Sequence, residues 1–168
     1  MQYTSAEAAK LLRKTKEELA AVLEKENKAG IFTAAVGENI EDVRPAYDFA
    51  GTREKVKDYH DRIRKIKHAM NEFNLRTLIP EFSMTIDEML VYIPQLSAEK
   101  SRLETMAAAL PKERVTGGYA PRTIVEYNYA NYNPEEAAKA LESVSDELAK
   151  AQTALDVVNN SVKFDINI

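Results

Sequence analysis

Residues 133–158, NPEEAAKALESVSDELAKAQTALDVV, carry the clearest fold signal in the chain. Asn133 is a good N-cap, Pro134 suits the first helical position, and the two glutamates that follow complement the positive end of the helix dipole. Apolar residues then recur at alternating spacings of four and three, at Ala137, Leu141, Val144, Leu148, Ala151, Leu155 and Val158. This 3.5-residue period predicts a long helix that packs along another helix as in a coiled coil.

Three earlier stretches repeat the same 4-3 spacing. The first follows a capping box of Thr4 with Glu7 and stops near Gly30, the second runs over residues 52–73, and the third follows a box of Thr85 with Glu88. Helices of about 25 residues would each be roughly 37 Å long. The pattern predicts a mainly α fold with a minor β component, an elongated bundle of about four helices that forms a single domain over residues 1–168.

Three short segments have the composition of strands. Residues 31–36 and 123–129 are rich in β-branched and aromatic side chains, and residues 162–168 alternate apolar with polar. We expect them to form a small sheet at one end of the bundle, with part of residues 30–51 included. Residues 111–122, which contain two glycines and two prolines, are predicted to be the most mobile loop.

Composition excludes several kinds of site. The chain of 168 residues has no cysteine, which rules out disulfides and thiolate chemistry, and it has two histidines. A dimetal site in a helical bundle needs a glutamate three residues before each histidine, but His60 and His68 have a lysine there. A zinc site on one helix needs two histidines four residues apart, and these two lie eight apart. We predict no catalytic, cofactor or metal-binding residues, and a protein that is not an enzyme. The start of the chain lacks the layout of a signal peptide and no stretch is apolar enough for a membrane span, so a cytoplasmic location is expected.

Charge is distributed unevenly between the predicted helices. Residues 52–76 hold eight basic side chains against four acidic ones, whereas residues 134–160 hold six acidic against two basic. Two interpretations stay open: a phosphate-binding face that includes Arg62 and Lys65, or pairing of oppositely charged helices within or between subunits. The overall net charge of −4 argues against nucleic acid as the partner.

Tyrosines cluster near the predicted central strand. Tyr119 and Tyr132 flank it, while Tyr127 and Tyr129 would share one of its faces. Such a face either binds a partner, because aromatic residues are enriched at interfaces, or covers the open end of the bundle. We therefore include Tyr127 and Tyr129 in the candidate surface.

A pair of asparagines belongs to a longer pattern. Asn71 and Asn74, then Thr85, Asp87 and Leu90 at a helix start, precede a strand that contains Ile124, Val125 and Tyr127. This arrangement, over roughly residues 55–166, resembles a bacterial family of small helical proteins of unknown function called septicolysin-like. The resemblance implies a fold and a bacterial origin, and no activity.

The sequence favours a non-enzymatic helical scaffold that forms homo-oligomers and contacts another protein. The alternative is a module that binds an anionic ligand or nucleic acid through the basic face of residues 52–76. A ligand or catalytic site built on Asn71, Asn74 and a neighbouring acid is a third hypothesis, since residues three apart share a helical face.

Overall fold

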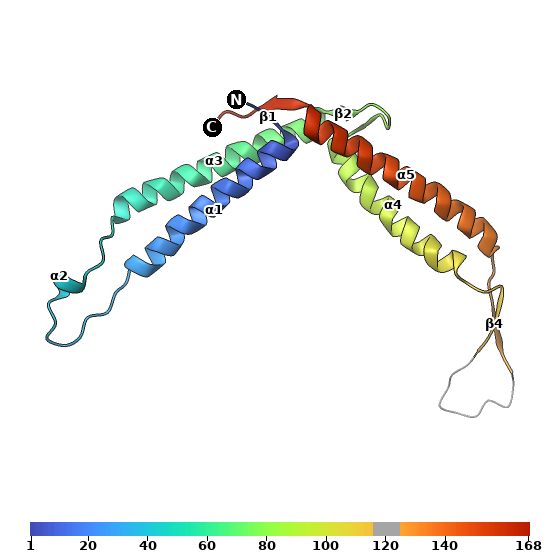
Figure 1. The fold of residues 1–168 in the computed structure, drawn as a ribbon, viewed down its shortest axis with the longest axis horizontal. Coiled ribbons are helices and arrows are strands. Elements are labelled where there is room, and N and C mark those ends of the chain that lie inside the picture. The colour runs from blue at the N-terminus through green and yellow to red at the C-terminus, as the bar shows by residue number, and fades with distance from the viewer. Residues whose placement is uncertain (116–124) are drawn as a thin grey trace. The chain divides into compact units, whose positions relative to one another are not determined.

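The computed structural model describes residues 1–115 and 125–168 (Figure 1). It is mainly α with a minor β component, as predicted. The helices are α1 (Ser5–Ala29), α2 (Ile40–Val43), α3 (Phe49–Arg76), α4 (Ile86–Ala107) and α5 (Pro134–Ser161). The short strands are β1 (Gln2–Thr4), β2 (Leu78–Ile79), β3 (Met84–Thr85), β4 (Lys112–Arg114), β5 (Tyr127–Tyr129) and β6 (Lys163–Asp165).

The predicted caps start the helices. The Thr4 and Thr85 side chains each accept a hydrogen bond, 3.2 Å long, from the backbone N–H three residues on. The carboxylates of Glu7 and Glu88 accept the reciprocal bonds from the cap N–H groups, so both capping boxes are confirmed. α3 begins earlier than predicted, because the Asp48 carboxylate accepts a 3.0 Å hydrogen bond from the Gly51 N–H and caps the helix there.

The predicted single sheet is wrong. The strands form three separate antiparallel pairs, β1 with β6, β2 with β3, and β4 with β5. Residues 31–36 are not a strand, and α2 is the only regular element between Gly30 and Phe49. A strand requires a hydrogen-bonding partner. Each observed pair has one: β2 and β3 pair across a short turn, β1 and β6 come from the two ends of the chain, and β4 pairs with the next strand along the sequence. Ile31, in contrast, is 89% exposed and has no neighbouring strand among the described residues.

The chain divides into two compact units. The first contains Met1–Thr77 and Val158–Ile168, and the second contains Leu78–Val157. In the first unit α1 and α3 lie side by side in antiparallel orientation (Figure 1). Its fully buried cluster of Ala8, Ile66 and Ile166 lies where β6 packs against both helices. The stacked rings of Phe73 and Phe164, 4.4 Å apart, belong to the same end.

The second unit is built on α4 and α5. Tyr92 of α4 donates a hydrogen bond to the Glu147 carboxylate of α5, and the Tyr132 hydroxyl donates to the Met106 carbonyl 3.2 Å away. Most buried apolar side chains of these two helices lie at the predicted 4-3 positions, including Met89, Leu96, Leu103, Ala137 and Ala151, whereas Ala154 is buried outside them. Each unit thus depends on one antiparallel helix pair.

Candidate interaction surfaces

The described part of the chain contains no cluster suited to metal binding. No group of three or more histidine, aspartate or glutamate side chains converges within residues 1–115 and 125–168. Both histidines are exposed on α3. Over the same residues, no helix is long and apolar enough to cross a membrane. The remaining candidates are surfaces.

A row of basic side chains follows one exposed face of α3. The row, here called the basic stripe, alternates spacings of four and three, as do the residues of α3 that face α1, and consists of Arg53, Lys57, His60, Arg64 and Lys67. Each member is one residue beyond an inward-facing position, about 100° further around the helix. Arg53, Lys57 and Lys67 have no ion-pair partner within the described residues, so their charges face solvent.

The predicted cations Arg62 and Lys65 lie off the basic stripe and are already paired. Arg62 Nε is 3.3 Å from Asp58 Oδ2, and Lys65 Nζ is 2.9 Å from Asp61 Oδ2. The hydrogen bond and positive charge of Lys65 hold the pKa of the Asp61 carboxyl below its ordinary value, and Arg64 makes a smaller contribution in the same direction. Both pairs are spaced four residues apart, a pattern already visible in the sequence. These two side chains are therefore weaker candidates for an anion than the unpaired members of the stripe.

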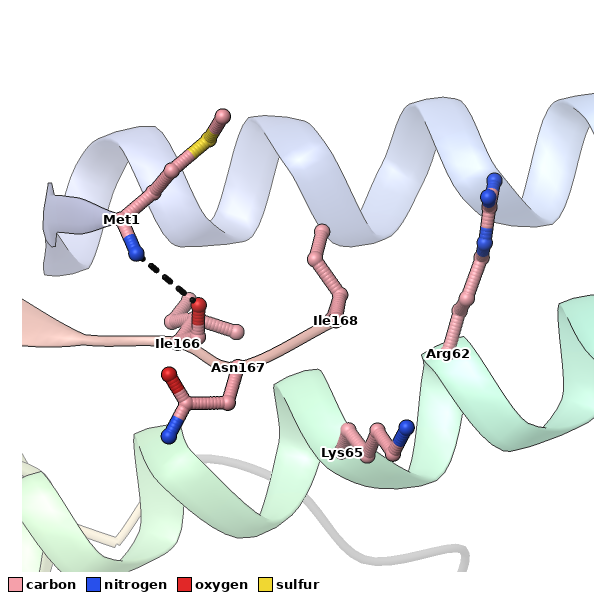
Figure 2. Close-up of a pocket in the computed structure, with 6 residues that line it drawn as sticks. All are labelled: Met1, Arg62, Lys65, Ile166, Asn167 and Ile168. Atoms are coloured by element: carbon pink, nitrogen blue, oxygen red, sulfur yellow. Dashed lines mark hydrogen bonds between the residues drawn. The ribbon is translucent and has the colours of Figure 1, made fainter.

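Arg62 and Lys65 nevertheless line a hollow of about 560 Å³ together with Met1, Ile166, Asn167 and Ile168 (Figure 2). The Met1 amine donates a 3.3 Å hydrogen bond to the Ile166 carbonyl at its edge. The hollow is wide open to solvent, and the aspartates beside its two cations neutralise them. We assign it no ligand.

The predicted asparagine pair stays within α3. Asn71 is exposed and Asn74 is half-buried, one turn apart, and the helix continues beyond both to Arg76. Neither side chain lines the hollow formed by Arg62 and Lys65. The structure therefore does not bring the two asparagines together with the predicted cations.

The tyrosine prediction is confirmed in its geometry. Tyr127 and Tyr129 lie on one face of β5 with ring centroids 6.4 Å apart, and both are exposed. Lys112 on the paired strand β4 places Nζ 4.1 Å from the Tyr127 ring centroid and 5.5 Å from that of Tyr129. These are cation–π contacts, which restrict the lysine and both rings. Tyr119 and most of the predicted loop 111–122 lie outside the described residues.

Acidic side chains occupy the outer face of α5. Glu135, Glu142 and Asp146 are exposed and lie two residues before the inward-facing positions Ala137, Val144 and Leu148. This set of three is called the acidic face. Lys139 shares it, and none of the three acids has an ion-pair partner in the described part of the chain. Composition predicted the excess of acid on this helix, and the spacing of the three acids could also have been predicted from their positions relative to the 4-3 apolar residues.

Apolar side chains remain partly exposed along both helix pairs. In the first unit the fully buried cluster lies near β6, while Val22, Val56 and Tyr59 further along α1 and α3 are only half-buried. In the second unit Leu90 is 48% exposed and its neighbour Val91 is 58% exposed. A pair of helices can cover only the facing side of each apolar face, and the flanks stay open.

Comparison with known proteins identifies one solved structure with a similar fold. No protein-family model and no curated protein matches the chain. Among solved structures it is similar to the crystal structure of a functionally unknown conserved protein from Corynebacterium diphtheriae, with a TM-score of 0.60 and 15% sequence identity. The match covers 98% of this chain and 100% of that one. At this identity the likeness shows a shared fold alone.

Proposed function

We propose that the protein is a non-enzymatic helical scaffold that associates with itself and presents its remaining surface to another protein. The observation that carries the proposal is the incomplete burial of the apolar faces of both helix pairs. Removal of apolar surface from water contributes about 25 cal/mol per Å². Half-exposed apolar positions on long helices therefore favour a further helical neighbour.

The flanks of α4 illustrate the surface involved. Leu90 and Val91 are adjacent, so they point to neighbouring sides of the helix, and each exposes about half of its side chain. Isolated exposed apolar residues are normal in proteins, but contiguous ones mark interaction sites. The cytoplasmic location and the resemblance to the septicolysin-like family remain predictions that accompany this proposal.

Light scattering on a sizing column, at two protein concentrations, tests self-association. We expect a mass of at least twice 18.9 kDa, the mass of one chain. The double variant Leu90→Gln, Val91→Gln should shift the equilibrium toward the monomer. Ile31→Gln, which changes an exposed residue outside the helix pairs, is the matched control and should leave the mass unchanged. A mass of 18.9 kDa for the unaltered chain at both concentrations would overturn the proposal.

The basic stripe supports a second candidate, an anion-binding module. Unpaired cations repeated along one helical face can follow a line of phosphates. Fluorescence anisotropy with a labelled DNA duplex at low salt tests this candidate, and binding should weaken steeply as salt is raised. Absence of binding at the lowest salt concentration would eliminate it.

A further inference from the structure

We propose that the basic stripe of α3 in one copy lies antiparallel along the acidic face of α5 in a second copy. The pairing places Arg53 opposite Asp146, Lys57 opposite Glu142, and Arg64 opposite Glu135. It rests on the proposed self-association and specifies which surfaces meet.

The spacings of the two charge sets match. Along the basic stripe, Lys57 follows Arg53 after four residues and Arg64 follows Lys57 after seven. From Asp146, read backwards along α5, the acids follow after four and then seven residues, at Glu142 and Glu135. Both sets span 11 residues, about 16 Å of helix. Three charge pairs can therefore form in one register without bending either helix.

The side chains of both sets are available for this pairing. All six side chains belong to exposed residues, and five have no ion-pair partner within residues 1–115 and 125–168. The exception, Arg64, lies 3.0 Å from Asp61, and the two side chains are 69% and 43% exposed. An exposed pair of this kind contributes little to stability. Arg64 can therefore exchange Asp61 for Glu135 of another copy at little cost.

The charges also favour one direction. A parallel alignment matches the spacing of the acids only with Arg53, His60 and Arg64 opposite Glu135, Glu142 and Asp146, and it places Lys57 opposite Lys139, two like charges. The antiparallel register avoids this contact between lysines, because His60 then lies opposite Lys139. Antiparallel helices also bring opposite ends of their dipoles together. Charge pairs at a rim set orientation more than affinity, so the half-exposed apolar flanks supply the binding energy.

Charge reversal with exchange of partners tests the pairing. Variant one carries Arg53→Glu and Lys57→Glu, and variant two carries Glu142→Lys and Asp146→Lys. Each alone should raise the dissociation constant of the self-complex by about tenfold or more, because like charges then face each other. An equimolar mixture should associate again, since the stripe of variant two matches the acidic face of variant one and the two reversed faces match each other.

A control separates the pairing from the change in net charge. Lys10→Glu with Lys16→Glu makes the same charge change as variant one on exposed residues of α1. It should retain the dissociation constant of the unaltered chain. If this control weakens association as much as variant one does, the stripe has no specific role and the inference is wrong.

Other outcomes distinguish the two proposals. Self-association that is unaffected in both variants would overturn the pairing and leave the scaffold proposal intact. A monomeric unaltered chain would overturn both. If a chain that carries all four reversals self-associates like the unaltered chain while the mixture of the two variants stays dissociated, the two surfaces pair within a single chain and the inference fails. Loss of DNA binding in variant one, together with a mixture that does not self-associate, would identify the stripe as a nucleic-acid surface, again against the inference.

Cross-linking tests the register, since the natural chain has no cysteine. His60 and Lys139 lie on the two faces between the Lys57–Glu142 and Arg64–Glu135 pairs, so the antiparallel register places them opposite each other. His60→Cys in one copy and Lys139→Cys in a second, mass-tagged copy should form a mixed disulfide, visible on a non-reducing gel. Lys16→Cys with Lys139→Cys is the matched control. Equal yields from the two combinations would overturn the register.

Discussion

The Tyr92 hydroxyl donates a hydrogen bond to the carboxylate of Glu147, and this contact joins α4 to α5 across 55 residues of sequence. Both side chains are half-buried, and the Phe82 ring lies 6.3 Å from the ring of Tyr92. The hydrogen bond to the carboxylate, followed by desolvation, raises the pKa of Tyr92 above its ordinary value of 10.0. The contact fixes how the two helices of the second unit are aligned along their length.

Replacement of Tyr92 tests how much that contact contributes to the free energy of unfolding. Tyr92→Phe keeps the ring and removes the hydroxyl, which leaves Glu147 without its partner on α4. We expect the free energy of unfolding to fall by about 1 kcal/mol, since a hydrogen bond to a charged group is worth more than a neutral one but this site is only half-buried. Urea denaturation measures the change. Tyr127→Phe, on an exposed ring, is the control, and an equal loss in both variants would contradict the prediction.

The capping box of α4 gives a second prediction. Thr85→Ala removes the side-chain oxygen that accepts the Glu88 N–H and should lower the free energy of unfolding by about 1 kcal/mol. Thr85→Ser preserves that oxygen and should cost much less. Thermal unfolding followed by circular dichroism measures both. Equal stability of the alanine and serine variants would show that the cap contributes nothing measurable.

Acid should weaken both capping boxes. Hydrogen bonds from Thr85 hold the pKa of Glu88 below its ordinary value of 4.5, and the bond from the Thr85 backbone N–H contributes most. Hydrogen bonds from Thr4 lower the pKa of Glu7 in the same way. A lowered pKa in the folded state means that the stabilisation is present above pH 4.5 and is lost as the pH falls through the folded-state pKa. Urea denaturation between pH 6 and pH 3 should therefore show a midpoint that decreases with acid.

Variants identify the carboxylates responsible. Glu88→Gln should flatten the acid dependence, because glutamine accepts the same hydrogen bond without titrating. Glu104→Gln, on an exposed position of the same helix, should leave the dependence as it is. If the two variants give identical pH profiles, Glu88 is not the source of the acid sensitivity.

The core of the first unit gives a fourth prediction. Ile66 is fully buried between Ala8 and Ile166, so Ile66→Ala should leave a cavity and cost about 3 kcal/mol. Ile63→Ala, one turn earlier and only half-buried, should cost clearly less. Chemical denaturation compares them. A smaller loss for Ile66→Ala than for Ile63→Ala would show that the β6 end is not the centre of this core.

Local signals accounted for much of the fold. The 4-3 apolar spacing and the boxes at Thr4 and Thr85 located helices because both act between residues within one or two turns. The early start of α3 escaped notice because the Asp48 cap is followed by Gly51, a residue that disfavours helix. The single predicted sheet failed because composition identifies residues that tolerate a strand but not the partner that completes it.

Some features of the surfaces could likewise be predicted from the sequence, and others could not. The pairing of Arg62 with Asp58 and of Lys65 with Asp61 follows from four-residue spacing and could have been anticipated, as could the basic stripe. The placement of Lys112 over Tyr127 and Tyr129 could not, because it depends on the pairing of β4 with β5.

Residue order alone settled where α1, α4 and α5 begin, which face of each long helix is apolar, and which charges repeat along α3 and α5, since all of these are properties of one helical segment. Tertiary contacts settled that the helices pair as α1 with α3 and α4 with α5, and that β1 meets β6 from the other end of the chain. An apolar face indicates only that another surface must cover it. What covers it depends on chain connections and on the free energy of competing contacts, which no single segment contains.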